Sequence, residues 1–126
     1  MDWLDIEFSR MPLFQFGDDL EQKILSPLSC IREHESKWIL EFDLPLVDKK
    51  DIAVYLDSDG MLVVEAKLKE TYYDSKAGVR HQFEYFKKAV RLPKNVDADK
   101  ITVKFTNGRL LITLPKMFRG TAIKVD

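Results

Sequence analysis

At 126 residues the chain fits a single domain of ordinary size, with little room for a second core. Hydrophobic residues make up 45% of it and charged residues 33%, which excludes the compositions typical of disordered and membrane-spanning proteins. The 20 basic and 21 acidic residues give a formal net charge of -1, so the overall charge does not favour nucleic-acid binding.

The segment before Pro27 is apolar but irregular. Trp3 and Ile6 have helical spacing, whereas Pro12 and Gly17 interrupt any long helix. We therefore predict a short, partly helical N-terminal arm over residues 1–26, outside the regular pattern that follows.

From Pro27 onward, apolar residues alternate with polar ones, which is typical of half-buried β-strands. Proline closes several of these runs, because it lacks the N–H that a strand ladder needs. The predicted strands are Trp38–Leu44, Ile52–Leu56, Leu62–Leu68, Phe83–Leu92, Ile101–Thr106 and Leu110–Leu114, with a weaker run over Leu28–Arg32.

Two tight turns connect pairs of these strands. Asn107 and Gly108 form the strongest short hairpin signal, because both residues tolerate the positive φ of a type I′ turn. The stretch Asp57–Gly60 has a faint calcium-loop spacing, but it lacks the distal glutamate, and a hairpin turn explains it better. Six or seven short strands without a convincing long helix predict an all-β, immunoglobulin-like antiparallel β-sandwich.

The stretch Glu70–Gln82 does not fit this pattern of short turns. It is long for a hairpin loop, and it still contains Tyr72, Tyr73 and Val79. We interpret it as a long loop with a function of its own.

The sequence offers few residues for catalysis or metal binding. His34, His81 and Cys30 are the only histidines and the only thiol, and they lack the spacing of a zinc site or a nucleophile pair. Nucleotide-binding glycine motifs are also missing from the sequence. We therefore predict a protein that is not an enzyme and that uses no cofactor or metal. A single cysteine, an acidic N-terminus and the lack of a long apolar run favour a cytoplasmic protein without stable membrane insertion.

Several short motifs occur in an order that resembles the small heat shock proteins and their α-crystallin domain. The resemblance extends from about Leu28 to Val125. Leu46, Lys88 and Val103 depart from the family's usual glycine, arginine and alanine at their positions. The motifs are Asp43-Leu44-Pro45, Val47-Asp48-Lys49-Lys50-Asp51-Ile52, Arg91-Leu92-Pro93, Asn95-Val96-Asp97, Asn107-Gly108-Arg109-Leu110, Leu114-Pro115-Lys116 and Ile123-Lys124-Val125.

This resemblance implies an ATP-independent chaperone, a holdase, that captures partly unfolded proteins and works as a dynamic oligomer of dimers. It also implies an α-crystallin domain over residues 27–116 and an extended C-terminal tail over residues 117–126. In similar family members the long loop pairs with the partner's first strand, so Val79–Phe83 is the expected crossing strand. The expected dimer contacts are Tyr72, Tyr73, Val79, Arg80 and Phe83.

The tail motif has a physical interpretation. Ile123 and Val125 point to the same side of an extended segment, so both can enter an apolar groove that the family fold implies between two edge strands. A tail packed on its own domain is the alternative. The connector from Lys116 to Ala122 could span roughly 20 Å, enough to reach a neighbouring dimer. The predicted groove residues are Ile52, Val54, Leu56, Ile101, Val103 and Phe105.

The arm is the candidate surface for client proteins, because flexible and flat apolar groups suit contact with varied unfolded segments. Packing of the same residues inside the oligomer is the alternative. A second interpretation is a monomeric co-chaperone module resembling the p23 and CS family, which lacks the terminal motif and the long loop. The predicted client-binding residues are Trp3, Leu4, Ile6, Phe8, Met11, Leu13, Phe14 and Phe16.

Overall fold

The computed structural model describes residues 18–19, 22–76, 79–117 and 125. Within these residues, two short 3₁₀ helices, η1 (Lys49–Asp51) and η2 (Ala98–Lys100), accompany the strands. The predicted arm residues Trp3 to Phe16, their partly helical conformation and Ile123 lie outside the described residues. The strands are β1 (Ile24–Leu25), β2 (Ser29–Glu33), β3 (Lys37–Asp43), β4 (Ile52–Leu56), β5 (Met61–Lys76), β6 (Val79–Arg91), β7 (Thr102–Thr106) and β8 (Arg109–Pro115).

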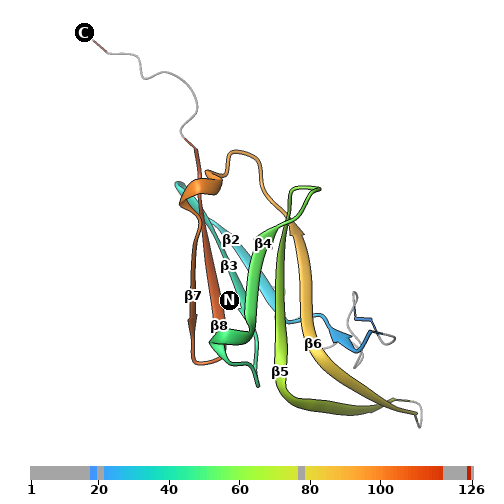
Figure 1. Cartoon of the computed structure of the whole chain (residues 1–126). Coiled ribbons are helices and arrows are strands. Elements are labelled where there is room, and N and C mark those ends of the chain that lie inside the picture. Colours follow the sequence, from blue (N-terminus) through green and yellow to red (C-terminus); the bar gives the residue numbers. More distant parts are fainter. Residues whose placement is uncertain (1–17, 20–21, 77–78, 118–124, 126) are drawn as a thin grey trace.

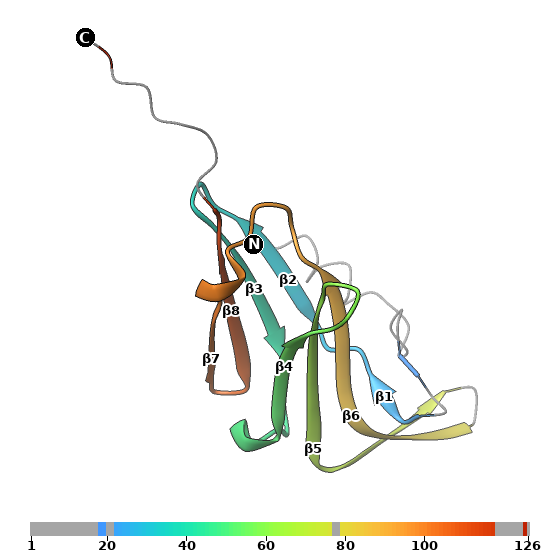
Figure 2. The same ribbon diagram turned by 45° about the horizontal axis from the view of Figure 1, so that its top comes forward.

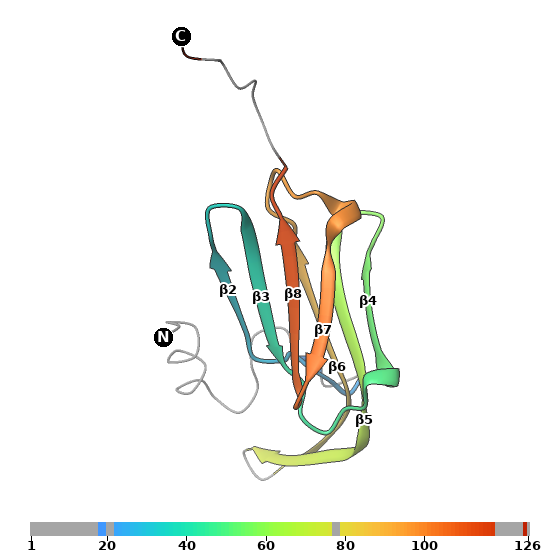
Figure 3. The same cartoon turned by 90° about the vertical axis from the view of Figure 1, so that its left-hand side faces the viewer.

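The strands form two four-stranded sheets that face each other (Figures 1 and 3). One sheet has the order β1-β6-β5-β4 and the other the order β2-β3-β8-β7. All strand pairs are antiparallel except β1 with β6, which pair in parallel near the bent end of β6 (Figure 2). The predicted all-β sandwich is confirmed, and β4 and β7 are edge strands of opposite sheets.

The two predicted turns are present. Asn107 and Gly108 have φ values of 51° and 77°, as a type I′ hairpin requires. In the turn before β5, the Asp57 carboxylate accepts hydrogen bonds from the backbone N–H groups of Asp59 and Met61, both at 2.9 Å. Asp57 therefore stabilises a hairpin turn, in agreement with the prediction.

The core lies between the inner faces of the two sheets. Leu44, Val64, Ile112 and Leu114 have no exposed surface. Burial of a large apolar side chain contributes about 1.5–3 kcal/mol, so these alternating residues hold the sheets together. The other buried residues of the core cluster are Leu40, Phe42, Val47, Leu62, Ala66, Leu68, Phe83, Phe86 and Leu110.

The interpretation of Glu70–Gln82 as a long loop is wrong. β5 continues to Lys76 and β6 begins at Val79, and the two strands pair through to this tip. A register shift between Lys67 and Tyr72 marks the place where the hairpin bends out of the sandwich (Figure 1). Asp74, Ser75 and Gly78 are typical of loops, but the aromatic and β-branched residues on either side of them, Tyr72, Tyr73 and Val79, favour strand pairing.

Candidate functional site

The predicted groove residues lie on one open side of the sandwich, on the inner faces of β4 and β7, with Ile101 immediately before β7. On β4, Val54 is the register partner of the fully buried Val64. On β7, Val103 is the register partner of the fully buried Ile112. Residues two apart on a strand share a face, so the neighbouring apolar residues of β4 and β7 also face inward. We call Ile52, Val54, Leu56, Ile101, Val103 and Phe105 the β4/β7 stripe.

The β4/β7 stripe is partly buried and partly open. Ile52, Val54, Ile101 and Phe105 pack against the core cluster. In contrast, the side chains of Leu56 and Val103 are 43% and 46% exposed. The structure thus brings the predicted residues together as an accessible apolar surface, and the binding of a tail there stays a prediction.

Val125 is the part of the tail motif that the structure describes. Its side chain is 91% exposed, so it does not pack on its own domain. Its partner in the motif, Ile123, lies outside the described residues. An isoleucine or valine this exposed gains free energy when an apolar surface covers it.

The opposite open side of the sandwich contains the outer edge of β2. Within the described residues β2 pairs only with β3. Asp43 N–H donates to the Leu28 carbonyl at 2.9 Å, and His34 N–H donates to the Lys37 carbonyl at 2.8 Å. Because hydrogen-bonding direction alternates along a strand, the backbone groups of Ile31 point away from β3. This edge can accept another strand.

The outer end of the β5–β6 hairpin holds the residues predicted for the dimer contact. Tyr72 and Tyr73 are 39% and 48% exposed, and the Arg80 guanidinium lies 3.9 Å from the centre of the Tyr73 ring. Phe83 is different, because it is 1% exposed and belongs to the core, where its ring lies 6.3 Å from that of Tyr72. Phe83 therefore anchors the hairpin and offers no exposed surface to a partner.

Lys88 is a residue whose position the sequence pattern did not predict. It is the register partner of Val64, so it points into the sandwich. Its ammonium group donates to the Ser29 hydroxyl on the opposite sheet at 2.5 Å. Burial lowers the pKa of Lys88, because the charged form loses hydration. A signal was present: Lys87 and Lys88 are adjacent in an alternating strand, so one of them must face inward.

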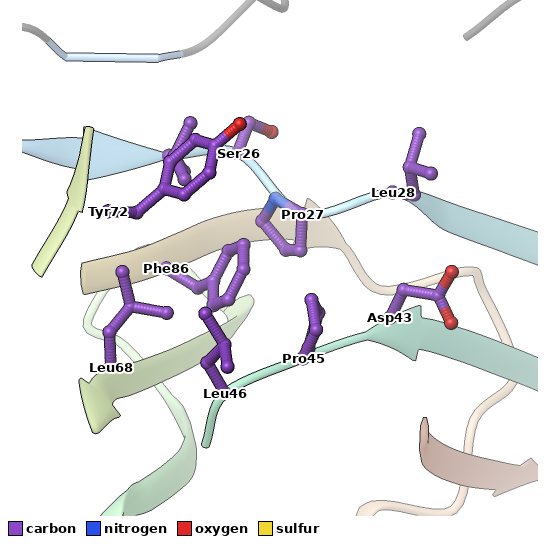
Figure 4. Close-up of a pocket in the computed structure, with 10 residues that line it drawn as sticks. Ser26, Pro27, Leu28, Asp43, Pro45, Leu46, Leu68, Tyr72 and Phe86 are labelled. Atoms are coloured by element: carbon purple, nitrogen blue, oxygen red, sulfur yellow. The ribbon is translucent and has the colours of Figure 1, made fainter. Parts of the chain in front are cut away.

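An apolar pocket lies next to the open side that contains β2 (Figure 4). It is formed by the link from β1 to β2, the loop after β3 and the bent part of the β5–β6 hairpin. Its volume is about 380 Å³. The sequence analysis did not predict it, because its walls come from distant segments. The lining residues are Leu25, Ser26, Pro27, Leu28, Asp43, Pro45, Leu46, Leu68, Tyr72 and Phe86.

The outer face of the β1-containing sheet carries a polar ladder across β4, β5 and β6. The Tyr55 hydroxyl donates to the Glu65 carboxylate at 2.6 Å, and the Lys87 ammonium lies 3.4 Å from it. The hydrogen bond to Glu65 raises the pKa of Tyr55, and the same bond lowers the pKa of Glu65. Both groups are exposed, so this ladder fits a solvated sheet face.

Neither a cluster of metal ligands nor a membrane-spanning helix occurs among the residues that the structure describes. Among them, no group of three or more histidine, cysteine, aspartate or glutamate side chains is placed to hold a metal ion. No helix within the described ranges has the length and apolar character needed to cross a membrane. Cys30 is buried, with 6% of its surface exposed.

Comparison with known proteins connects this geometry to one family. The model of the Hsp20/alpha crystallin family matches residues 30–125. Small heat shock protein C4 of Rickettsia felis is 34% identical over 131 residues, covering 94% of this chain and 74% of that protein. Heat shock protein 16 of Schizosaccharomyces pombe is 34% identical over 105 residues, and the match covers 79% of this chain and 73% of that protein. The crystal structure of a small heat-shock protein from Xylella fastidiosa superimposes with a TM-score of 0.60 at 26% identity, covering 79% of this chain and 94% of that one.

Proposed function

The chain belongs to the Hsp20/alpha crystallin family, and we propose that it is an ATP-independent holdase that binds partly unfolded proteins and prevents their aggregation. Membership of the small heat shock protein family supports a chaperone role. We place this activity in the cytoplasm, in keeping with the single cysteine of the sequence. The observation that carries the proposal is an exposed apolar tail residue, Val125, in a chain whose sandwich also has an accessible apolar stripe.

In this proposal the tail motif of one dimer binds the β4/β7 stripe of another. Burial of Ile123 and Val125 contributes about 1.5–3 kcal/mol each, and ordering the tail offsets several kcal/mol of this. One such contact is therefore weak, with a Kd of roughly 1 mM. Many contacts in a closed particle act together, so the oligomer is stable while each subunit can still leave.

The dimer itself is proposed to form through strand exchange. The outer end of the β5–β6 hairpin leaves Tyr72, Tyr73 and Arg80 exposed, and the outer edge of β2 has no strand partner among the residues that the structure describes. Residues 79–82 of one chain would pair with β2 of its partner, while Phe83 stays in its own core. Exchange of this kind covers an edge that would otherwise invite aggregation.

Client proteins are proposed to bind the apolar residues of the N-terminal arm. The arm combines aromatic and aliphatic side chains with acidic residues such as Asp2, Asp5 and Glu7, which keep it soluble. Dissociation of weakly bound dimers on heating would expose these residues when unfolded clients are most abundant.

The test measures aggregation of a heated model protein by light scattering in the absence of ATP. The model protein is heated together with the intact chain or with the Ile123→Ala/Val125→Ala variant. The intact chain should suppress aggregation as a large particle, whereas the double variant should elute as a dimer of the 14.7 kDa chain with altered protection. Lys124→Ala is the matched control, because in an extended tail the side chain of Lys124 would point away from those of Ile123 and Val125. An unchanged particle size in the double variant would contradict the role of the tail, and an intact chain that elutes as a monomer would favour the co-chaperone interpretation.

A further inference from the structure

β6 has a free edge beyond the place where β1 ends. Within the described residues, β1 pairs only with Tyr85 and Phe86, whereas β6 continues to Arg91. Figure 2 shows β1 beside the lower part of β6 only. Residues 87–91 of β6 therefore have β5 on one side and no strand on the other, within the part of the chain that the structure describes.

The direction of the backbone groups of β6 follows from the turn before β5. Asp57 N–H donates to the Met61 carbonyl at 3.0 Å, so the backbone groups of Met61 point toward the side of β4. Hydrogen-bonding direction alternates along a strand, so Val64, three residues later, points toward β6. Its register partner Lys88 therefore directs its own N–H and carbonyl groups toward β5.

The alternate residues of β6 point the other way. The backbone N–H and carbonyl groups of Lys87, Ala89 and Arg91 are directed away from β5, along the free edge. Tyr85 agrees with this pattern, because its N–H donates to the Lys23 carbonyl, just before β1, at 3.2 Å. Three alternate residues thus offer donors and acceptors in a row, as the addition of a strand requires.

Space and positive charge accompany these backbone groups. A cleft of about 450 Å³ lies beside the first part of the edge, with Lys87 and Ala89 among its lining residues. The side chains of Lys87, Ala89 and Arg91 are exposed. The Lys87 ammonium lies 3.4 Å from the Glu65 carboxylate and Asp19 also lines the cleft, so the charge at this end is partly balanced. Arg91, at the far end, forms no ion pair among the described residues.

The basic residues limit what can bind to this edge. Lys87 and Arg91 are four residues apart, about 13 Å along the strand, and they lie on the same face of the sheet. A second copy of β6 in antiparallel register around Ala89 would place these cations opposite each other, and like charges directly opposite are destabilising. A segment with carboxylates at positions i and i+4 would instead place one acid near each cation.

We propose that residues 87–91 of β6 are a binding site for an extended acidic segment of another polypeptide, which adds to the sheet as a strand. Backbone hydrogen bonds at Lys87, Ala89 and Arg91 hold the segment. Its carboxylates fix the register through charge-assisted contacts with Lys87 and Arg91. The assignment of such segments to client proteins rests on the proposed chaperone function, whereas binding at the edge does not.

The first test measures binding of a labelled peptide to the full-length chain by fluorescence polarisation. The peptide is Glu-Val-Ala-Val-Glu, with a fluorescent group at its N-terminus and an amide at its C-terminus. Replacement of both glutamates by lysine, or of the central alanine by proline, should weaken binding about tenfold, because the first reverses the charges and the second interrupts the ladder. Equal affinities of the three peptides would overturn the proposal.

A pair of variants tests whether the peptide binds at β6. Ala89→Pro removes an N–H from the free edge without removing a bond to β5, and it should weaken binding of the glutamate peptide about tenfold. Ala89→Thr keeps the N–H and is the matched control, with an unchanged affinity expected. Circular dichroism checks that both variants are folded. Equal affinities of the two folded variants would overturn the proposal.

A charge reversal supplies a measurement that does not depend on a proline in a strand. In Arg91→Glu the preference should invert, so that the lysine peptide binds more tightly than the glutamate peptide. Lys104→Glu makes the same change in net charge on β7 of the other sheet, and it should keep the original preference. An unchanged preference in Arg91→Glu would contradict the proposal.

These measurements contain no client protein, so the two proposals fail separately. A chain that protects a heated model protein but does not prefer the glutamate peptide would reject the edge site alone. A chain that binds the glutamate peptide at β6 without protecting the model protein would support the edge site and reject the proposed holdase function.

Discussion

The two open sides of the sandwich differ in their side chains although both are bordered by edge strands. The β4/β7 stripe consists of apolar residues, with Leu56 and Val103 exposed at its edge. On the side of β2, Ile31 is 38% exposed on the inner face, and Lys88 reaches across to Ser29 on the opposite sheet. One side therefore offers apolar surface, and the other combines a half-buried lysine with a strand edge that has no partner within the described residues.

This difference implies two kinds of contact with two strengths. An apolar stripe binds side chains without strict geometry, which suits the weak and reversible docking of a tail. An inward-pointing lysine at a sheet edge disfavours non-specific apolar contact, so a partner at β2 must be recognised through backbone hydrogen bonds in register. We expect the β2 side to hold the dimer and the β4/β7 side to hold the larger particle.

The largest effect is expected from Ile31→Pro. The Ile31 N–H points away from β3, so proline removes a donor from the free edge without removing a bond to β3. If the partner's strand pairs here, the variant should elute as a folded monomer, and the particle should be lost with the dimer. Ile31→Ala removes the same side chain and keeps the N–H, so it should still form a dimer.

Circular dichroism and light scattering after gel filtration are the measurements. A dimer that survives Ile31→Pro would show that β2 is not the exchange edge. Dissociation by both variants would instead assign the contact to the isoleucine side chain.

A smaller loss of assembly is expected from Val103→Glu in the β4/β7 stripe. The carboxylate would be accessible at an exposed position, so the domain should fold, but covering the charge with the tail would cost several kcal/mol. Gel filtration should show dimers in place of the particle. Thr102→Glu places the same charge on the outer face of β7 and should leave the particle intact. If both variants assemble normally, the tail binds elsewhere.

The sequence predicted much of this architecture, because period-two alternation and Asn107-Gly108 are local signals. The open sides were predicted only through family resemblance, since strand order depends on contacts between distant segments. The length of the β5–β6 hairpin was missed because Asp74 and Ser75 resemble a loop, while pairing with the opposite strand outweighs that preference. The backbone of Leu46 was also missed, because the positive φ follows from how the loop after β3 meets Lys69.

A difference of about 1 kcal/mol is expected between Leu46→Gly and Leu46→Ala, with glycine the more stable. Both variants remove the side chain from the pocket on the β2 side, and they differ chiefly in the freedom to adopt a φ of 61°. Urea unfolding of the two variants measures the difference directly. Equal free energies of unfolding for the two variants would mean that the backbone at this position is not strained.

The smallest effect concerns the cation that distinguishes the two sides. Burial lowers the pKa of Lys88 below its ordinary value of 10.5, so in the folded state the charged form is penalised relative to the unfolded chain. Lys88→Met should therefore be at least as stable as the native chain at pH 7, by no more than about 1 kcal/mol. Above the lowered pKa the folded chain binds fewer protons than the unfolded chain, so the native protein should gain stability relative to Lys88→Met as the pH rises toward 10.5.

Urea unfolding at pH 7 and at pH 9.5 measures this gap, and Lys87→Met controls for the change in net charge, because Lys87 lies on the exposed face of the same strand. A gap that narrows as the pH rises, beyond the change seen with Lys87→Met, supports a cation confined between the sheets. A gap that widens would mean that the Lys88 charge stabilises the β2 side. That outcome would contradict the expected penalty on the charged form of Lys88 in the folded state.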